Sequence, residues 1–270
     1  MESEAVLTPA LAAAALEWLI DSGADALVDE AAGTWLKPQF SLPSSEEPAK
    51  GLSPNDRPRN ARQKRPAQVA ARNPAFPTTL TAHTLDDLRA EAKAYPLSLR
   101  ADNKSLVFAD GNPDADIMVI GEAPGAQEER EGKPFVGPAG QLLDKMLAAI
   151  KLDRNSVYIT NLSPWRPAQN RTPSAPEAAE CLPLLHRHIA IVKPKLILTV
   201  GGTSAKALLA TEAGIMRLRG KWRDIEVEGE IYPVLPTFHP AFLMRQPEQK
   251  RLAWQDLLTF RKRATDLTAA

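Results

Sequence analysis

From about residue 81 onwards, short apolar runs alternate with stretches of helical periodicity. The apolar runs are predicted strands at residues 117–120, 157–160, 196–200 and 232–235. Helices are predicted at residues 140–150, 176–192, 203–209 and 248–263. Strands that are apolar on both faces are typical of parallel sheets covered by helices. The alternation therefore predicts an α/β fold with a mainly parallel sheet and helices on both faces.

The residues ahead of this region differ in composition and are predicted to form two segments. Residues 1–36 are acidic, and an apolar stripe after Thr8 and Pro9 predicts a helical appendage. Its apolar face either covers a patch of the same chain or binds a partner. Residues 37–80 are rich in proline and polar side chains, which predicts a disordered linker ahead of a folded domain at 81–270.

The predicted linker carries a run of positive charge. The run consists of Arg57, Arg59, Arg62, Lys64, Arg65 and Arg72, with Asp56 as an acidic neighbour. Two interpretations are open, because such a segment is either a solvated spacer or a basic tether that binds the phosphates of a polyanion.

The composition of the 270-residue chain excludes several classes of protein. The formal net charge is +0, so nucleic-acid binding would have to come from a local basic patch. Cys181 is the single cysteine, which excludes an internal disulfide and a site with several thiolate ligands. No run approaches the roughly 18 apolar residues of a membrane span. The start Met-Glu-Ser-Glu has the wrong charge for a secretory leader, so we expect a cytoplasmic protein.

Ligands of such folds bind beyond the carboxyl ends of the strands, where this chain places polar and aromatic residues. Glu122 follows the first predicted strand, with Phe135 further along the same connection. Asn161 follows the second strand and His239 the fourth. Asparagine can read the edge of a base, phenylalanine can stack on it, and histidine can donate to an oxygen that gains negative charge. With a glutamate to orient or deprotonate water, the set suits cleavage of a glycosidic bond in which a base leaves as an anion.

Two segments at these strand ends resemble motifs of the uracil-DNA glycosylase superfamily, in its family four branch. The segment GEAPGAQEEREGKPFVGPAGQLL, from Gly121 to Leu143, resembles the first motif, and HPAFLMR from His239 resembles the second. Asn161 in VYITN, residues 170–173 and residues 218–220 also fit. The resemblance extends over roughly residues 85–262. It implies a three-layer α/β/α domain that flips uracil out of DNA and hydrolyses its N-glycosidic bond, leaving an abasic site for base excision repair.

The resemblance also implies a role for each matching residue. Glu122 would activate the water, and His239 would stabilise the uracil anion. Phe135 would stack on uracil, and Asn161 would read its edge and reject cytosine. The remaining substrate-binding positions are Gly121, Ala123, Pro124 and Gly125. Contacts with the DNA backbone or the opened duplex are expected from Gly202, Thr203, Ser204 and Arg245.

Family four proteins typically bind an iron–sulfur cluster through four cysteines, and this chain departs from that pattern. The matching positions hold Ala92, Tyr95, Trp165 and Cys181. One thiolate cannot hold the cluster, so we expect neither a cofactor nor a metal. We expect Tyr95 and Trp165 to fill the vacated volume as an apolar plug, and Cys181 to be a buried structural residue.

Three functions are compatible with the sequence. The first is a uracil-DNA glycosylase that acts as a monomer on uracil in single- or double-stranded DNA. The second is a non-catalytic DNA-binding protein on a degenerate glycosylase fold, which the missing cluster ligands favour and the retained Glu122, Asn161 and His239 oppose. The third is an α/β enzyme for free nucleotides, which the basic linker disfavours because a small ligand needs no polycationic tether.

Overall fold

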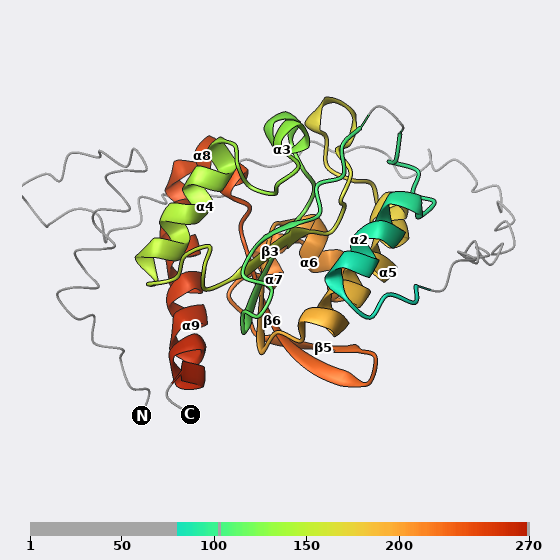
Figure 1. Ribbon diagram of the computed structural model, residues 1–270. Coiled ribbons are helices and arrows are strands. Elements are labelled where there is room, and N and C mark those ends of the chain that lie inside the picture. Colours follow the sequence, from blue (N-terminus) through green and yellow to red (C-terminus); the bar gives the residue numbers. More distant parts are fainter. Residues whose placement is uncertain (1–79, 102–103, 269–270) are drawn as a thin grey trace, which may run out of the picture. The chain divides into compact units, whose positions relative to one another are not determined.

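A central sheet between two layers of helices organises the computed structural model, which describes residues 80–101 and 104–268 (Figure 1). The predicted helix within residues 1–36 and the predicted linker up to residue 79 lie outside the described residues. Within the part of the chain that the structure describes, no helix is long and apolar enough to cross a membrane.

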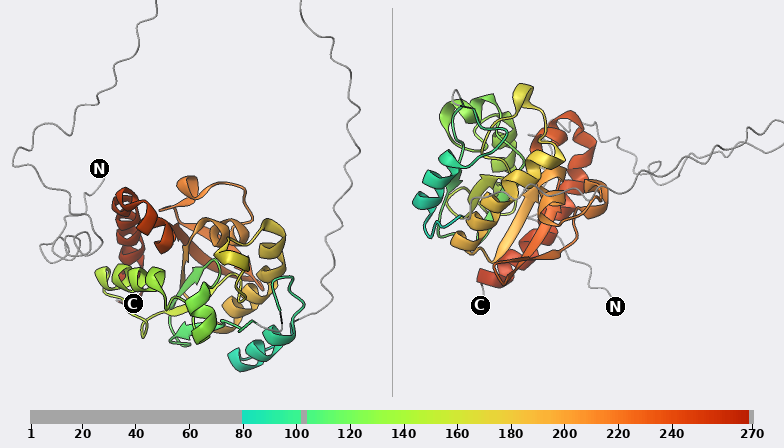
Figure 2. Two further views of the ribbon diagram at one scale, coloured as in Figure 1. Left: turned by 90° about the horizontal axis from the view of Figure 1, so that it is seen from above. Right: turned by 90° about the vertical axis from the view of Figure 1, so that its right-hand side faces the viewer.

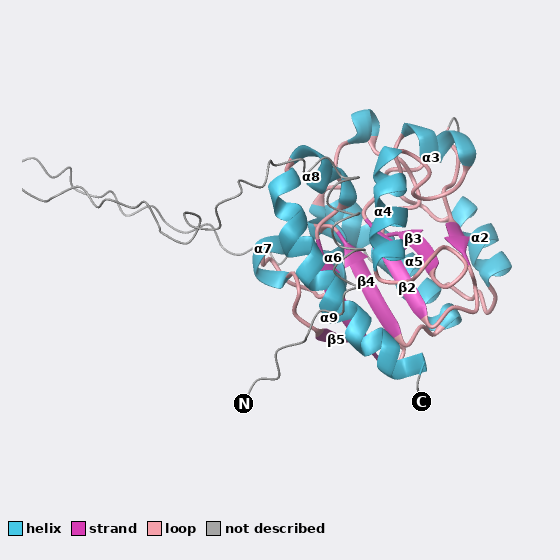
Figure 3. Cartoon of the chain, turned by 90° about the vertical axis from the view of Figure 1, so that its left-hand side faces the viewer, coloured by secondary structure: helices cyan, strands magenta, loops and turns pink. Residues whose placement is uncertain are grey.

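The sheet contains six strands in the order β1-β3-β2-β4-β6-β5. Its central strands run parallel to one another: β2 (Ile117–Gly121), β3 (Tyr158–Asn161), β4 (Leu196–Val200) and β6 (Glu230–Thr237). The edge strands β1 (Ala109–Gly111) and β5 (Arg223–Val227) are antiparallel to their neighbours. Figure 3 shows β2 and β4 side by side within this sheet. The predicted α/β fold with a mainly parallel central sheet is confirmed.

Both edge strands and the ends of β6 differ from the sequence-based prediction. β1 has only three residues, and three of the five positions of β5 are exposed. Neither therefore shows the continuous apolar run of a strand that is buried on both faces. Pro233 and Pro236 lie within β6, although proline cannot donate a ladder hydrogen bond. The predicted strand, residues 232–235, contains Pro233 and stops before Pro236, whereas β6 extends two residues further at each end.

Helices cover both faces of the sheet (Figures 1 and 2). One face carries α2 (Leu85–Ala94), α5 (Ala175–Val192) and α6 (Gly202–Leu208). The other carries α4 (Pro138–Ala149), α8 (Pro240–Arg245) and α9 (Lys250–Thr268). Short helical segments in the connections are α3 (Ala126–Glu131), η1 (Ala168–Asn170), α7 (Ile215–Leu218) and η2 (Pro247–Gln249).

Two apolar cores form between the sheet and these helix layers. Alternate residues of β2 face opposite sides, so that Met118 and Ile120 belong to the core under α2 and α5, whereas Ile117 and Val119 belong to the core under α4 and α9. This division explains why the central strands are apolar without interruption.

The strand order reverses beside β2. The chain passes from β2 to its neighbour β3 and then returns across β2 to β4 on the other side. Open α/β sheets bind ligands outside the carboxyl ends of the strands at such a point. The residues that follow β2 begin with Glu122, so the fold places the predicted site residues at this crevice.

Candidate active site

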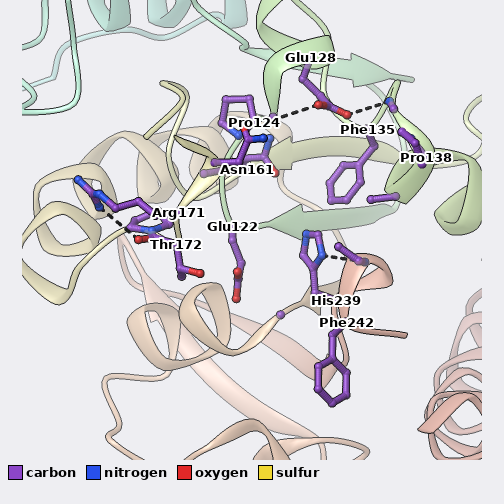
Figure 4. Close-up of a pocket in the computed structure, with 18 of the residues that line it drawn as sticks. Glu122, Pro124, Glu128, Phe135, Pro138, Asn161, Arg171, Thr172, His239 and Phe242 are labelled. Carbon is purple, nitrogen blue, oxygen red and sulfur yellow. Dashed lines mark hydrogen bonds between the residues drawn. The ribbon is translucent and has the colours of Figure 1, made fainter. Parts of the chain in front are cut away.

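A cavity of about 630 Å³ opens beyond the carboxyl ends of the parallel strands (Figure 4). All of the predicted catalytic and substrate-binding residues line it except Gly121, which ends β2. Figure 4 shows Glu122, Phe135, Asn161 and His239 around this space. Glu122 and Phe135 come from the connection between β2 and α4, Asn161 ends β3, and His239 follows β6. The structure therefore brings together residues that lie up to about 120 positions apart in the sequence.

Gly121 allows two of these side chains to approach one another. It pairs with Asn161 in the parallel register of β2 and β3. A Cβ atom at Gly121 would lie 2.3 Å from Oδ1 of Asn161 and 2.5 Å from Cζ of Phe135. Only glycine fits at this position, which lies directly beside the polar end of Asn161 and the ring of Phe135.

Asn161 presents a buried acceptor that the protein leaves without a partner. The residue is 5% exposed, and its Oδ1 atom receives no hydrogen bond from the described residues. A buried polar atom without a partner costs free energy, and this one lies beside Gly121 in a residue that lines the cavity.

His239 is fixed in one tautomer by the backbone. It is the N-cap of α8, and its Nδ1 atom accepts a hydrogen bond of 3.1 Å from the amide of Ala241. The proton of the neutral ring is therefore on Nε2. Burial lowers the pKa of His239 despite the opposing charge of Glu122, so the ring is a neutral donor near pH 7. Its ring centroid lies 5.8 Å from that of Phe135.

Glu122 is held by the start of α6. Its Oε1 atom accepts a hydrogen bond of 2.8 Å from the backbone amide of Thr203. A helix N-terminus is a favourable place for a carboxylate, because its free amides and dipole attract negative charge. Gly201, with φ at +124°, makes this approach possible, since a Cβ atom there would lie 2.5 Å from Oε1 of Glu122.

Comparison with known proteins identifies the family. The family model described as the uracil DNA glycosylase superfamily matches residues 108–258, which is more than half of the chain. The chain belongs to the uracil-DNA glycosylase superfamily. The resemblance of its two strand-end motifs is thereby confirmed.

Several similar proteins are type-4 uracil-DNA glycosylases, which form one branch of this superfamily. The type-4 uracil-DNA glycosylase of Sulfurisphaera tokodaii is 40% identical over 166 residues, covering 58% of this chain and 74% of that protein. The protein of the same name from Pyrobaculum aerophilum is 39% identical over 163 residues, covering 58% and 82%. That of Thermotoga maritima is 37% identical over 167 residues, covering 61% and 84%.

Only some of the residues that are predicted to contact DNA line the cavity. Gly202 and Arg245 line the cavity, and Arg245 is exposed. Thr203 does not line it, and its amide donates to Glu122. Ser204 is completely buried, and its hydroxyl donates to the carbonyl of Gly201 at 3.4 Å. This burial excludes a DNA contact through the Ser204 hydroxyl group.

The wall opposite α8 contains residues whose roles are not predicted from the sequence. Asn170, Arg171, Thr172 and Pro173 line the cavity between β3 and α5. Arg171 is held by a bidentate ion pair with Glu177, at 2.6 and 2.7 Å. The motif resemblance at residues 170–173 was the available signal, but the pairing with Glu177 depends on the course of the connection.

The four positions that correspond to cluster ligands lie together in one core. Ala92, Tyr95, Trp165 and Cys181 are each less than 5% exposed and belong to the apolar cluster under α2 and α5. Burial raises the pKa of the Cys181 thiol to about 12, which disfavours the thiolate that a metal needs. Among the described residues, no group of three or more His, Cys, Asp or Glu side chains could hold a metal ion. The residues present do not fit an iron–sulfur cluster.

Proposed function

We propose that this protein flips uracil out of DNA, hydrolyses its N-glycosidic bond and leaves an abasic site. The observation that carries the proposal is Asn161, a residue that lines the cavity and whose buried Oδ1 atom has no partner among the described residues. Uracil has a hydrogen on N3 and can donate to this atom. Neutral cytosine has an acceptor at N3, which would face the acceptor of Asn161. The names of the type-4 relatives support the same substrate.

The cavity supplies the apolar and geometric part of base recognition. Phe135 is 5% exposed, and its ring lies beside Gly121 and Asn161. An aromatic face at this place can stack on a flipped base while Asn161 reads the edge of the same base. A base inside the duplex could not reach either side chain, so flipping is part of the proposal.

His239 would stabilise the leaving group. When the bond between C1′ and N1 breaks, its electron pair goes to the base, and the carbonyl oxygens of uracil gain negative charge. The Nε2–H group of His239 is the free donor of this ring, since Nδ1 accepts from Ala241. A preorganised donor in a site that excludes water stabilises such charge in the transition state.

Glu122 would act on the water and the sugar. The water oxygen forms the new bond to C1′, and the carboxylate orients the water and accepts its proton. The negative charge of Glu122 also stabilises the positive charge that develops on the sugar. The hydrogen bond from Thr203 fixes the carboxylate during this step.

The proposed DNA contacts are made by the residues that line the cavity. Gly202 and the exposed Arg245 lie at its wall and are suited to the strand that flanks the flipped base. We propose that single- and double-stranded DNA are both substrates. We also propose that the protein acts as a monomer. We place the protein in the cytoplasm as a DNA-repair enzyme.

The proposal includes activity without an iron–sulfur cluster. Tyr95 and Trp165 occupy the core where two of the ligands would be required, and their bulk supports an apolar plug in place of the cluster. No step of the proposed reaction involves a metal ion or a cofactor.

Oligonucleotides that contain one uracil test the function directly. The protein is incubated with single- and double-stranded forms, and abasic sites are cleaved with alkali. We expect cleavage at uracil in both forms and none in matched oligonucleotides with cytosine. Glu122→Gln, which keeps the size but removes the basicity, should lose roughly 100-fold of the rate. Tight binding of uracil-DNA without any release of uracil would contradict the proposal and favour a non-catalytic binding protein.

A further inference from the structure

Phe135 has a backbone conformation that few phenylalanines adopt. Its φ is 54°, in the left-handed region, and the residue lies in the connection between α3 and α4. Such a conformation is unfavourable for a bulky side chain and persists only where surrounding contacts impose it. The first turn of α4 packs against it closely, since a Cβ atom at Gly140 would lie 1.8 Å from the carbonyl oxygen of Phe135.

The amides that follow Phe135 are held by Glu128. This buried carboxylate accepts hydrogen bonds from the amides of Val136 at 3.1 Å and Gly137 at 2.8 Å, both to Oε1. Its Oε2 atom accepts from the amide of Gly125 at 3.1 Å. Figure 4 shows Glu128 bridging the two segments. Because both of its oxygens are occupied by backbone donors, Glu128 holds the loop and is not placed to take a proton from water.

Arg154 binds the backbone carbonyls of Pro134 and Phe135. This residue lies between α4 and β3 and does not line the cavity. Its Nη2 group donates to the carbonyl of Phe135, and Nη1 donates to the carbonyl of Pro134 at 3.3 Å. The ring of Phe135 therefore projects from a peptide segment whose carbonyls and amides are both bound.

Arg154 is itself fixed by two carboxylates. Its Nε donates to Asp144 of α4 at 2.8 Å, and its Nη1 donates to Asp110 of β1 at 2.7 Å. The planar guanidinium thus connects a strand, a helix and the Phe135 loop at once. Lysine could not reproduce this arrangement, because one ammonium group cannot reach four acceptors in a fixed plane.

We infer that Arg154 is a positioning residue that acts through Phe135. By binding the carbonyl of Phe135, it keeps the left-handed backbone and thereby the ring orientation that receives the flipped base. This inference rests on the proposed function of the cavity and assigns a determinant of base binding outside it. Arg154 itself touches neither the base nor the sugar.

A double-mutant cycle of Arg154→Met and Phe135→Ala tests the inference through activity. We expect Arg154→Met to lower kcat/KM for uracil excision about tenfold, mainly by raising the half-saturating concentration. In the Phe135→Ala background, the same substitution should have little further effect, because its target is gone. An equal loss in both backgrounds would overturn the inference and indicate a general structural role.

A matched control separates positioning from stability. Arg187 is also a partly buried arginine that binds a backbone carbonyl, that of Ala82, and a carboxylate, that of Glu228, and it does not line the cavity. Arg187→Met should lower the melting temperature without changing the half-saturating concentration. If Arg154→Met does not fold, Arg154→Lys serves in the same cycle, with a smaller expected loss.

Amide hydrogen exchange gives a readout that does not depend on the reaction. In Arg154→Met, the amides of Val136 and Gly137 should exchange at least about tenfold faster, while the amide of Val119 in β2 stays protected. Unchanged exchange at Val136 and Gly137 would overturn the positioning role even in an active enzyme. Wild-type protein that releases no uracil would instead contradict the proposed function, whatever the exchange result.

Discussion

The carboxylate of Glu122 and the backbone amide of Thr203 are joined by a hydrogen bond of 2.8 Å that connects the end of β2 to the start of α6. This contact crosses between neighbouring strands of the sheet, because β2 pairs with β4 and α6 follows β4. The α6 N-terminus therefore serves as the support of the proposed water-activating group. Because this amide binds Glu122, the predicted contact of Thr203 with DNA would have to use its hydroxyl group.

Gly201→Ala should disturb Glu122 specifically. The added Cβ would meet Oε1 of Glu122 at 2.5 Å in a backbone with φ at +124°. We expect the maximal single-turnover rate of uracil release to fall at least about tenfold. Gly229→Ala is the matched control, because Gly229 also has a positive φ, +86°, but its Cβ would meet nothing within 4 Å. Similar rates for the two variants would argue against the support of Glu122 by this turn.

Glu177→Gln should lower the free energy of unfolding by an amount that depends on pH. The hydrogen bond from Arg171 lowers the pKa of Glu177 to about 2 from an ordinary value of 4.5. The folded state therefore binds fewer protons than the unfolded state, so the stabilisation is complete above pH 4.5 and is lost as the pH falls toward 2. At neutral pH, we expect the substitution to lower the free energy of unfolding by about 0.5–1 kcal/mol, since it removes the charge of a solvent-screened ion pair while glutamine can still complete the capping box of α5.

Urea unfolding of the wild type and Glu177→Gln across the acid range checks this expectation. The difference between the two proteins should shrink as the pH decreases. Glu226→Gln, on an exposed position of β5, is the control and should match the wild type throughout. A difference that stays constant down to the lowest pH would show that the charge of Glu177 contributes nothing.

The purified protein should be colourless and contain almost no iron. The chain offers Ala92, Tyr95, Trp165 and Cys181 where four thiolates would be required. Metal analysis and the visible absorption spectrum measure this directly. Iron at about four atoms per chain, with charge-transfer absorption, would contradict the expectation.

The basic segment at residues 57–72 gives a prediction for salt dependence. If it tethers DNA, deleting residues 50–72 should weaken binding and reduce the slope of log affinity against log salt by about 0.9 for each lost duplex contact. Single-turnover excision at saturating protein should stay near wild type. A length-matched variant with glutamine at the six basic positions separates charge from spacing. An unchanged slope in both variants would favour a plain spacer.

Sequence patterns predict the buried strands and the strand-end residues well, because both depend on local signals. β2 and β4 are continuous apolar runs, and Glu122, Asn161 and His239 lie at or directly after the ends of their strands. The edge strand β5 was not predicted because it has no continuous apolar run, since three of its five positions are exposed, and it gains its partner only in the folded sheet.

The supporting contacts of the site could not be predicted from sequence. Arg154 and the carbonyl of Phe135 are 19 residues apart, and Thr203 and Glu122 are 81 residues apart. Such pairs depend on how loops meet above the sheet, for which periodicity carries no information. The burial of the Ser204 hydroxyl could not be predicted for the same reason, since the turn of α6 directs this group into the protein.

The central claim is that Asn161 selects uracil within a catalytic pocket, and single-turnover release of free uracil measures it most directly. Asn161→Asp replaces the amide by a carboxyl group with a different set of donors and acceptors, so we expect the release rate to fall at least about tenfold. Asn112→Asp is the control, because Asn112 uses Oδ1 to accept from Asp114 away from the cavity. The account predicts rapid uracil release by the wild type and Asn112→Asp and slow release by Asn161→Asp. Equal rates for all three proteins would contradict it, as would no release by the wild type.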